Sequence, residues 1–230
     1  MGPDSDEDGP PRVQVVALDV LETCVALEPL RTRFTEVGQP AHLLDTWFAR
    51  TLRDGAVLAA AGGFHPFREV GAAALRTVTR DALDDDAVAY VLGGMSRLPA
   101  HPDLAPAVER LRTAGVRVMA VTNGGVDVAR RLLEDAGVLP QLDHVLSIDD
   151  VGAWKPSPRV YHAAAARGGA PPDQTALVAA HAWDCHGARR AGLASGWVSR
   201  WEGRWPDVFD RPDVEGPDLV AVADALLARH

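Results

Sequence analysis

The sequence contains four polar residues that each follow a short apolar segment and together suit catalysis by a carboxylate nucleophile. They are Asp19, Thr122, Lys155 and Asp184, in that order. An aspartate can attack an electrophilic carbon or phosphorus atom and form an ester, which water later hydrolyses. A lysine beside it holds the carboxylate ionised through a charge-assisted hydrogen bond. Each residue alone has an ordinary explanation as a helix cap or a surface charge, so the hypothesis depends on the ordered set.

The same hypothesis gives supporting roles to neighbouring groups. Asp184 would orient Lys155 or the attacking water. Hydroxyl groups and backbone N–H groups near the strand ends would hold the anionic end of a substrate. These groups belong to Val20, Leu21, Thr23 and Thr122.

The pattern of apolar segments predicts the fold that would bring these residues together. An apolar, β-branched run at 13–18 predicts a buried strand that ends at Asp19. Further strands are predicted at 116–122, 144–148, 175–181 and 196–199. They alternate with helices at 102–114, 126–136, 158–167, 184–191 and 217–229. The alternation predicts an α/β fold, a parallel sheet of about five strands with helices on both faces, whose strand ends share one edge.

Glycines mark the ends of four of these helices. They are Gly115, Gly137, Gly168 and Gly192. Each can take the left-handed backbone conformation that commonly ends a helix.

The segment 28–97 has a different pattern. Its apolar residues recur at helical spacing and predict three or four helices with no strand between them. Because it follows the first strand, the simplest interpretation is a helical cap domain inserted into a core domain made of 12–27 and 98–230. Residues 1–11 are acidic and rich in Pro and Gly, and we expect a disordered tail there.

Composition and charge argue against several classes of partner. The net charge is −9 and the basic residues form no cluster, which disfavours nucleic acids and anionic membranes. The apolar runs are too short and too often interrupted to span a bilayer, and no apolar segment follows Met1. We therefore expect a cytoplasmic protein with a small-molecule substrate.

The cysteines and one group of tryptophans support two further predictions. Cys24 and Cys185 lie far apart in the chain and are expected to be small buried apolar groups rather than a disulfide or a zinc site. Trp197, Trp201 and Trp205 lie near the last predicted strand. They indicate either a contact with the cap or a patch that forms a homodimer.

The motifs around the four polar residues resemble those of the haloacid dehalogenase superfamily. The most similar branch is the type II 2-haloacid dehalogenases. The motifs are Asp-Val-Leu-Glu-Thr at 19–23, Val-Thr-Asn-Gly at 121–124, Trp-Lys-Pro-Ser-Pro at 154–158 and Trp-Asp-Cys-His-Gly-Ala at 183–188. The resemblance extends over nearly the whole chain from Val13. It implies a Rossmann-like core and a helical cap that closes over the site.

The resemblance also implies roles for individual residues. Asp19 matches the nucleophile of the family. Trp183 matches an aromatic residue near the halide, with core packing as the alternative interpretation. The positions that support the nucleophile or bind the substrate match Thr23, Thr122, Asn123, Lys155, Tyr161 and Asp184.

Leu21 separates two branches of this superfamily. Phosphatases of the superfamily have a second aspartate at this position, which protonates the leaving alkoxide and helps to bind magnesium. An aliphatic side chain forfeits that proton and about 10²-fold in rate, whereas a halide leaves without a proton. We therefore predict cleavage of the carbon–halogen bond of a small 2-haloalkanoic acid, with no cofactor. The alternatives are an Mg²⁺-dependent hydrolase of a phosphorylated or phosphonate substrate, with Asp19 and Asp184 as ligands, or a catalytically impaired binding protein.

Two positions depart from the family pattern. Dehalogenases commonly have a cap arginine that receives the halide, but here Gln39 stands at that position, and Arg31 and Arg33 lie further upstream. His181 stands where the family commonly has Asn. Its imidazole either acts as a base in ester hydrolysis or simply fills the substrate-binding position.

Overall fold

The fold is built on a six-stranded parallel sheet. It was examined in a computed structural model that describes residues 12–229, so the tail predicted for 1–11 lies outside the described residues. The strand order is β3-β2-β1-β4-β5-β6. The strands are β1 (Val15–Asp19), β2 (Arg117–Thr122), β3 (His144–Ser147), β4 (Thr175–Ala179), β5 (Ala194–Val198) and β6 (Val214–Gly216). This order confirms the predicted α/β, Rossmann-like class.

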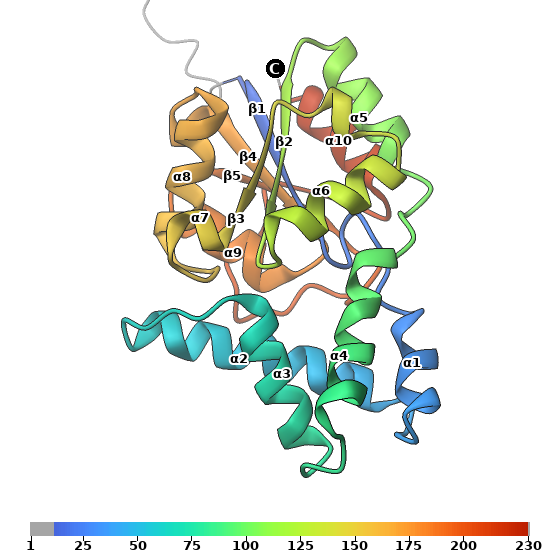
Figure 1. The fold of residues 1–230 in the computed structure, drawn as a ribbon. Coiled ribbons are helices and arrows are strands. Elements are labelled where there is room, and N and C mark those ends of the chain that lie inside the picture. Colours follow the sequence, from blue (N-terminus) through green and yellow to red (C-terminus); the bar gives the residue numbers. More distant parts are fainter. Residues whose placement is uncertain (1–11, 230) are drawn as a thin grey trace, which may run out of the picture.

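Helices cover both faces of the sheet. The helices of the α/β units are α5 (Leu104–Thr113), α6 (Val126–Asp135), α7 (Ile148–Val151), α8 (Pro158–Gly168), α9 (Ala182–Arg190) and α10 (Leu219–Leu227). Figure 1 shows α5, α6 and α10 on one face, and α8 and α9 on the other. Except for α7, which was not predicted, the predicted boundaries of these helices and of the first five strands fall within two residues of those observed.

Three features differ from the prediction. The sheet has six strands rather than about five, because β6 is only three residues long and Val214 is its single large apolar residue. Helix α7 is a single turn with too few residues to show a helical period. The left-handed residue that ends α8 is Gly169, with φ 72°, rather than Gly168. A Cβ at Gly168 would lie 2.6 Å from Cγ1 of Val15, so that glycine allows α8 to approach β1.

Strand β1 is the switch point of the sheet. The chain passes from β1 to β2 and β3 on one side, then crosses to β4 on the other side of β1. Connections from β2 and β4 therefore diverge around the carboxyl end of β1, where open α/β sheets place their ligands. Asp19 is the last residue of β1.

Four helices lie between β1 and α5, as the helical spacing predicted. They are α1 (Leu30–Glu36), α2 (Leu43–Ala60), α3 (Phe67–Val78) and α4 (Asp85–Gly93), followed by a 3₁₀ turn at Gly94–Arg97. They form a layer beside the carboxyl ends of the strands (Figure 1). Trp47 is buried in this layer, packs near Phe34 and Phe67, and donates from Nε1 to the carbonyl oxygen of Gly71 at 2.8 Å.

Trp154 joins the inserted helices to the α/β core. This residue lies in the loop between α7 and α8 and is fully buried. Its ring stacks on Phe67 with centroids 5.8 Å apart, and its Nε1 donates to the carbonyl oxygen of His65 at 2.8 Å. A Cβ at Gly55 of α2 would lie only 2.2 Å from Cε3 of Trp154. Helix α2 can therefore rest on this loop only because residue 55 is glycine.

The structure also describes the two cysteines and the three tryptophans near the last strands. Cys24 and Cys185 are buried free thiols, as expected. Trp197 and Trp205 are buried and pack edge to face, whereas Trp201 is 43% exposed and faces α2 across a cavity. Trp201 therefore lies on the side of the core that faces the inserted helices, and both the cap contact and the homodimer stay predictions. Within residues 12–229, no helix is both long and apolar enough to cross a bilayer.

Candidate active site

Asp19 lies buried at the end of β1, and both of its carboxylate oxygens are held by neighbouring side chains. Thr23 donates from Oγ1 to Oδ2 at 2.8 Å, and Lys155 donates from Nζ to Oδ1 at 2.9 Å. Nδ1 of His181 lies 3.6 Å from Oδ2. These contacts orient a carboxylate that is only 6% exposed.

The loop after β1 turns sharply to bring Thr23 back to Asp19. Glu22 takes a left-handed conformation with φ 65°, and the backbone N–H groups of Cys24 and Val25 both donate to the carbonyl oxygen of Val20. The hydroxyl of Thr23 also accepts from the N–H of Ala180, at 2.9 Å. One threonine thus links the nucleophile candidate to the loop after β4.

Lys155 lies at the centre of a chain of buried polar groups. Its ammonium donates to Oδ2 of Asp184 at 2.8 Å as well as to Asp19. Tyr161 donates from its hydroxyl to Oδ1 of Asp184 at 2.6 Å. Asn123 accepts at Oδ1 from the backbone N–H of Lys155, at 3.1 Å, and so anchors the loop that carries the lysine.

The charges in this chain of groups stabilise one another. Burial alone would raise the pKa of Asp19, but the positive charge of Lys155 and the neighbouring His181 outweigh it and lower that pKa below its ordinary value. Burial likewise opposes the ammonium of Lys155, yet the carboxylates of Asp184 and Asp19 raise the pKa of the lysine. Burial and the adjacent Asp184 raise the pKa of Tyr161 well above its usual value. At neutral pH Asp19 is therefore ionised, Lys155 is charged and Tyr161 is a neutral donor.

His181 directly precedes helix α9 and is buried beside Asp19. Its ring packs near the rings of Phe48 and Trp183, with centroids 5.9 and 5.6 Å away. Burial disfavours the imidazolium, but the carboxylate of Asp19, followed by those of Asp184 and Glu202, outweighs burial and raises the pKa of His181. The Nε2 atom is buried and has no hydrogen-bond partner in the described part of the chain.

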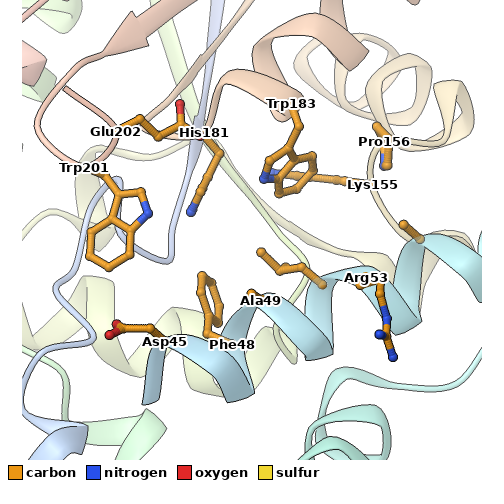
Figure 2. Close-up of a pocket in the computed structure, with 12 residues that line it drawn as sticks. Asp45, Phe48, Ala49, Arg53, Lys155, Pro156, His181, Trp183, Trp201 and Glu202 are labelled. Carbon is orange, nitrogen blue, oxygen red and sulfur yellow. The ribbon is translucent and has the colours of Figure 1, made fainter. Parts of the chain in front are cut away.

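A cavity of about 420 Å³ separates helix α2 from the loops of the core (Figure 2). The core contributes Lys155, His181 and Trp183, and Phe48 of α2 lies opposite. Trp201, Glu202 and Asp45 line one end of the cavity. Its walls are thus aromatic and contain the two cations that contact Asp19.

A second cavity, of about 260 Å³, is lined by three other predicted substrate-binding residues. Val20, Leu21 and Thr122 line it from the core, and Phe67 and Arg68 line it from α3. Of the predicted site residues, Lys155, His181 and Trp183 line the larger cavity and a second group lines the smaller one, while the others line neither cavity. Thr23, Lys155, Asp184 and Tyr161 form one bonded group with Asp19, while Val20, Leu21 and Thr122 face the second cavity.

No guanidinium reaches Asp19 in the described residues, where the cations within 4 Å of its carboxylate are Lys155 and His181. Arg31 forms an ion pair with Asp45 at 2.7 Å, and Arg33 lies over the ring of Tyr90. A further arginine, Arg53, lines the larger cavity, but its guanidinium binds Asp54 at 2.6 Å and points away from Lys155 in Figure 2.

The residues around Asp19 do not suit a magnesium ion. The two carboxylates that would be ligands, Asp19 and Asp184, both bind the ammonium of Lys155, which occupies the space between them. Leu21 offers no oxygen, and Mg²⁺ requires an octahedral set of oxygen ligands. Across residues 12–229, no group of three or more His, Cys, Asp and Glu side chains is arranged to hold a metal.

The sequence did not indicate several residues of this site. Phe48 and Trp201 line the larger cavity from segments with no recognisable motif. Glu202 accepts at Oε2 from the N–H of Ala182, at 2.9 Å, and so fixes the backbone beside His181. For Asn123 the motif indicated the substrate pocket, whereas its observed contact is the loop of Lys155. Such contacts depend on loop geometry and carry no local pattern.

Comparisons with known proteins match this chain to haloacid dehalogenase-like hydrolases. A profile of haloacid dehalogenase-like hydrolases matches residues 17–192. An (S)-2-haloacid dehalogenase of Pseudomonas putida is 26% identical over 83% of this chain and 86% of its own length. An (S)-2-haloacid dehalogenase of Burkholderia cepacia is 32% identical over 61% of this chain and 60% of its own length.

A solved structure shares the fold along most of both chains. It is an L-2-haloacid dehalogenase of Xanthobacter autotrophicus with chloropropionic acid covalently bound. It superposes with a TM-score of 0.83 and 21% identity, and covers 92% of this chain and 97% of that one.

Proposed function

This chain belongs to the haloacid dehalogenase-like hydrolases, and on that premise we propose that it hydrolyses the carbon–halogen bond of a small 2-haloalkanoic acid through an ester on Asp19. The observation that carries the proposal is the ion pair between Asp19 and Lys155, because it keeps a buried carboxylate ionised and oriented. The curated relatives that act on (S)-2-haloacids and the covalent chloropropionic adduct of the Xanthobacter enzyme support the substrate class.

In the first half-reaction, a carboxylate oxygen of Asp19 attacks C2 of the substrate and the halide leaves with the bonding electrons. Thr23 and Lys155 hold the carboxylate in position for this attack. Leu21 supplies no proton to a leaving group, and a halide needs none. The aliphatic residue at this position therefore favours a halide over an alkoxide as the leaving group.

In the second half-reaction, water attacks the side-chain carbonyl carbon of Asp19. The bond between that carbon and the alkyl oxygen breaks, which releases a 2-hydroxy acid and restores the carboxylate. Lys155 remains charged throughout because Asp184 binds it from the other side.

Substrate binding is assigned to the two cavities that flank Asp19. The N–H groups of Val20 and Leu21 and the hydroxyl of Thr122 bind the substrate carboxylate from the smaller cavity. His181 and Trp183 contact the reacting part of the substrate from the larger cavity. Asn123 and Tyr161 act through Lys155 and Asp184.

The proposal extends to the domains, the cofactor, the substrate and the cellular location of the protein. Helices α1–α4, within residues 28–97, form a cap domain, and 12–27 with 98–230 form the core domain. The reaction needs no cofactor, because the residues around Asp19 bind an ammonium where a metal would lie. The substrate is a small molecule, and the protein works in the cytoplasm.

One assay tests the reaction class. The purified protein is given 2-chloropropionate with EDTA, and in parallel a panel of phosphate esters with Mg²⁺. We expect release of chloride that EDTA does not reduce, and no release of phosphate. Asp19→Asn should abolish chloride release while the protein stays folded, because the substitution preserves size and removes the nucleophile. Phosphate release that requires Mg²⁺ would overturn the proposal.

A further inference from the structure

His181 places an imidazole beside the reacting carboxylate, and one of its nitrogens has no partner. Nδ1 lies 3.6 Å from Oδ2 of Asp19, and Nε2 is buried without a hydrogen bond among the described residues. The ring projects into the larger cavity above Phe48 (Figure 2). Buried polar atoms are nearly always satisfied, so a ring nitrogen that no protein group binds, beside a nucleophile, is available to water or substrate.

The charged groups around His181 come from several elements. The rings of Phe48 and Trp183 pack near it, with centroids 5.9 and 5.6 Å away, and contribute no charge. The titratable groups that surround it or share its cavity are Asp19, Glu22, Asp45, Arg53, Lys155, Asp184 and Glu202. Of these, the carboxylate of Asp19 has the largest favourable effect on the imidazolium.

Ester formation removes that favourable effect. While Asp19 is a carboxylate, its negative charge stabilises a proton on His181 and raises the pKa of the imidazole. An ester at Asp19 has no charge, so burial, which disfavours the imidazolium most, is then opposed only by the weaker effects of Asp184 and Glu202. The ring therefore becomes a neutral base at the stage when water must be activated.

Other groups beside Asp19 cannot take this role. The ammonium of Lys155 has no lone pair. The carboxylate of Asp184 is bound by Lys155 at one oxygen and by Tyr161 at the other. Thr23 donates its hydroxyl proton to Asp19. Among the described neighbours of Asp19, the imidazole is the group with a basic nitrogen free to accept a proton.

We propose that His181 is the general base of the second half-reaction, protonated beside the free carboxylate and neutral beside the ester. This inference rests on the proposed function, since it assumes an ester at Asp19. Water donates a proton to Nδ1, which faces Asp19, while Nε2 faces the cavity.

The proton balance closes over one turnover. After the halide leaves, the imidazolium releases a proton to solvent. The neutral imidazole takes a proton from water as the water oxygen bonds to Cγ of Asp19. It returns that proton to the alkoxide when the bond between Cγ and the alkyl oxygen breaks. The remaining carboxylic acid of Asp19 then passes its proton to His181, and the net products are the 2-hydroxy acid, a halide and one proton.

A rapid-quench experiment with 2-chloropropionate tests the proposal by following chloride and the intact mass of the protein. In His181→Gln, we expect a burst of one equivalent of chloride, accumulation of the ester on Asp19, and ester hydrolysis at least ~100-fold slower than in the wild type. In His181→Ala, added imidazole should accelerate ester hydrolysis. The control is His186→Gln, because His186 lies on α9 but contacts Phe209 and Asp210 instead of the site.

Each other outcome overturns the inference. If the wild type turns over but His181→Gln gives neither a burst nor an ester, His181 acts in the first half-reaction or only in packing. If the variant turns over at the wild-type rate, no base is needed at this position. If the wild type itself releases no chloride and forms no adduct, the proposed function fails first.

A measurement on the wild type does not depend on whether a variant folds. In single turnovers, the rate of ester hydrolysis should fall about tenfold per pH unit below the pKa of the imidazole beside the ester, which burial holds below its ordinary value. The rate of ester formation should stay constant from about pH 7 to pH 5, because Asp19 remains ionised. Parallel pH profiles for the two steps would contradict the proposal.

Discussion

The ammonium of Lys155 lies 2.9 Å from Oδ1 of Asp19, and both side chains are buried. Lys155 is also the only lysine in the chain, which otherwise has 22 arginines among its 23 basic residues. A compact ammonium can fit between two carboxylates where a planar guanidinium is too wide. The geometry therefore explains why this one position has lysine in a chain that uses arginine elsewhere.

Lys155→Met should remove the charge that keeps Asp19 ionised. It leaves two buried carboxylates without their cation, so we expect a loss of about 3–5 kcal/mol in the free energy of unfolding. Turnover at pH 7 should fall by at least ~100-fold, because a smaller fraction of Asp19 is ionised as its pKa rises and the hydrogen bond that orients its carboxylate is lost. Urea unfolding and chloride release measure the two effects. Lys155→Arg should also be impaired, and full activity in Lys155→Arg would mean that charge alone is sufficient.

The single lysine allows a direct observation of its charge. Protein labelled with ¹³C at Cε of lysine should give one side-chain NMR signal. Because Asp184 and Asp19 raise the pKa of Lys155, this signal should still report an ammonium at about pH 10.5, where an ordinary lysine is half deprotonated. In Asp184→Asn the titration should move to lower pH. A signal that titrates below pH 9 in the wild type would show that burial outweighs the carboxylates.

The contribution of His181 to stability should depend on pH in a defined direction. A group whose pKa is raised on folding stabilises the native state below its unfolded pKa, near 6.5, and loses that contribution as the pH rises through the folded pKa. The difference in unfolding free energy between the wild type and His181→Gln should therefore be larger at about pH 5.5 than at about pH 8.5. Urea titrations at both pH values measure it, with His186→Gln as the matched control. The opposite order would mean that the imidazole is neutral in the resting protein.

Gly55→Ala should disturb the contact between α2 and the loop of Lys155. The new Cβ would lie 2.2 Å from the ring of Trp154, so either the helix or the indole must move. We expect a loss of about 1–3 kcal/mol in stability and slower turnover, because Trp154 directly precedes Lys155. Gly63→Ala is the control, since its Cβ would meet Leu58 at an ordinary 3.5 Å. If Gly55→Ala and Gly63→Ala changed turnover equally, the position of Trp154 would have no effect on catalysis.

The sequence predicted the parts of the fold that follow from local pattern and topology. Asp19 and Thr122 end apolar strands, and parallel strands bring such ends to one edge, so their proximity required no knowledge of side-chain packing. The loop after β3 is short, which places Lys155 near the same edge.

The remaining parts depend on how separate elements rest on one another. Phe48 lies beside His181 because α2 packs across the loop after β4. The spacing of apolar residues in α2 predicts a helix, but it does not predict which loop of the core that helix packs against. The arginine expected from the family pattern is absent beside Asp19 in the described residues, where the cations at its carboxylate are Lys155 and His181. Strand β6 was missed because three residues cannot show an alternating pattern.

The most direct test of covalent catalysis by Asp19 is the fate of the water oxygen. A single turnover of excess enzyme with 2-chloropropionate in H₂¹⁸O is followed by mass spectrometry of the peptide that contains Asp19 and of the product. We predict that one ¹⁸O enters the side chain of Asp19 and that the product hydroxyl carries ¹⁶O. Label in the product hydroxyl, with Asp19 unlabelled, would show that water attacks the substrate directly and would contradict the covalent mechanism.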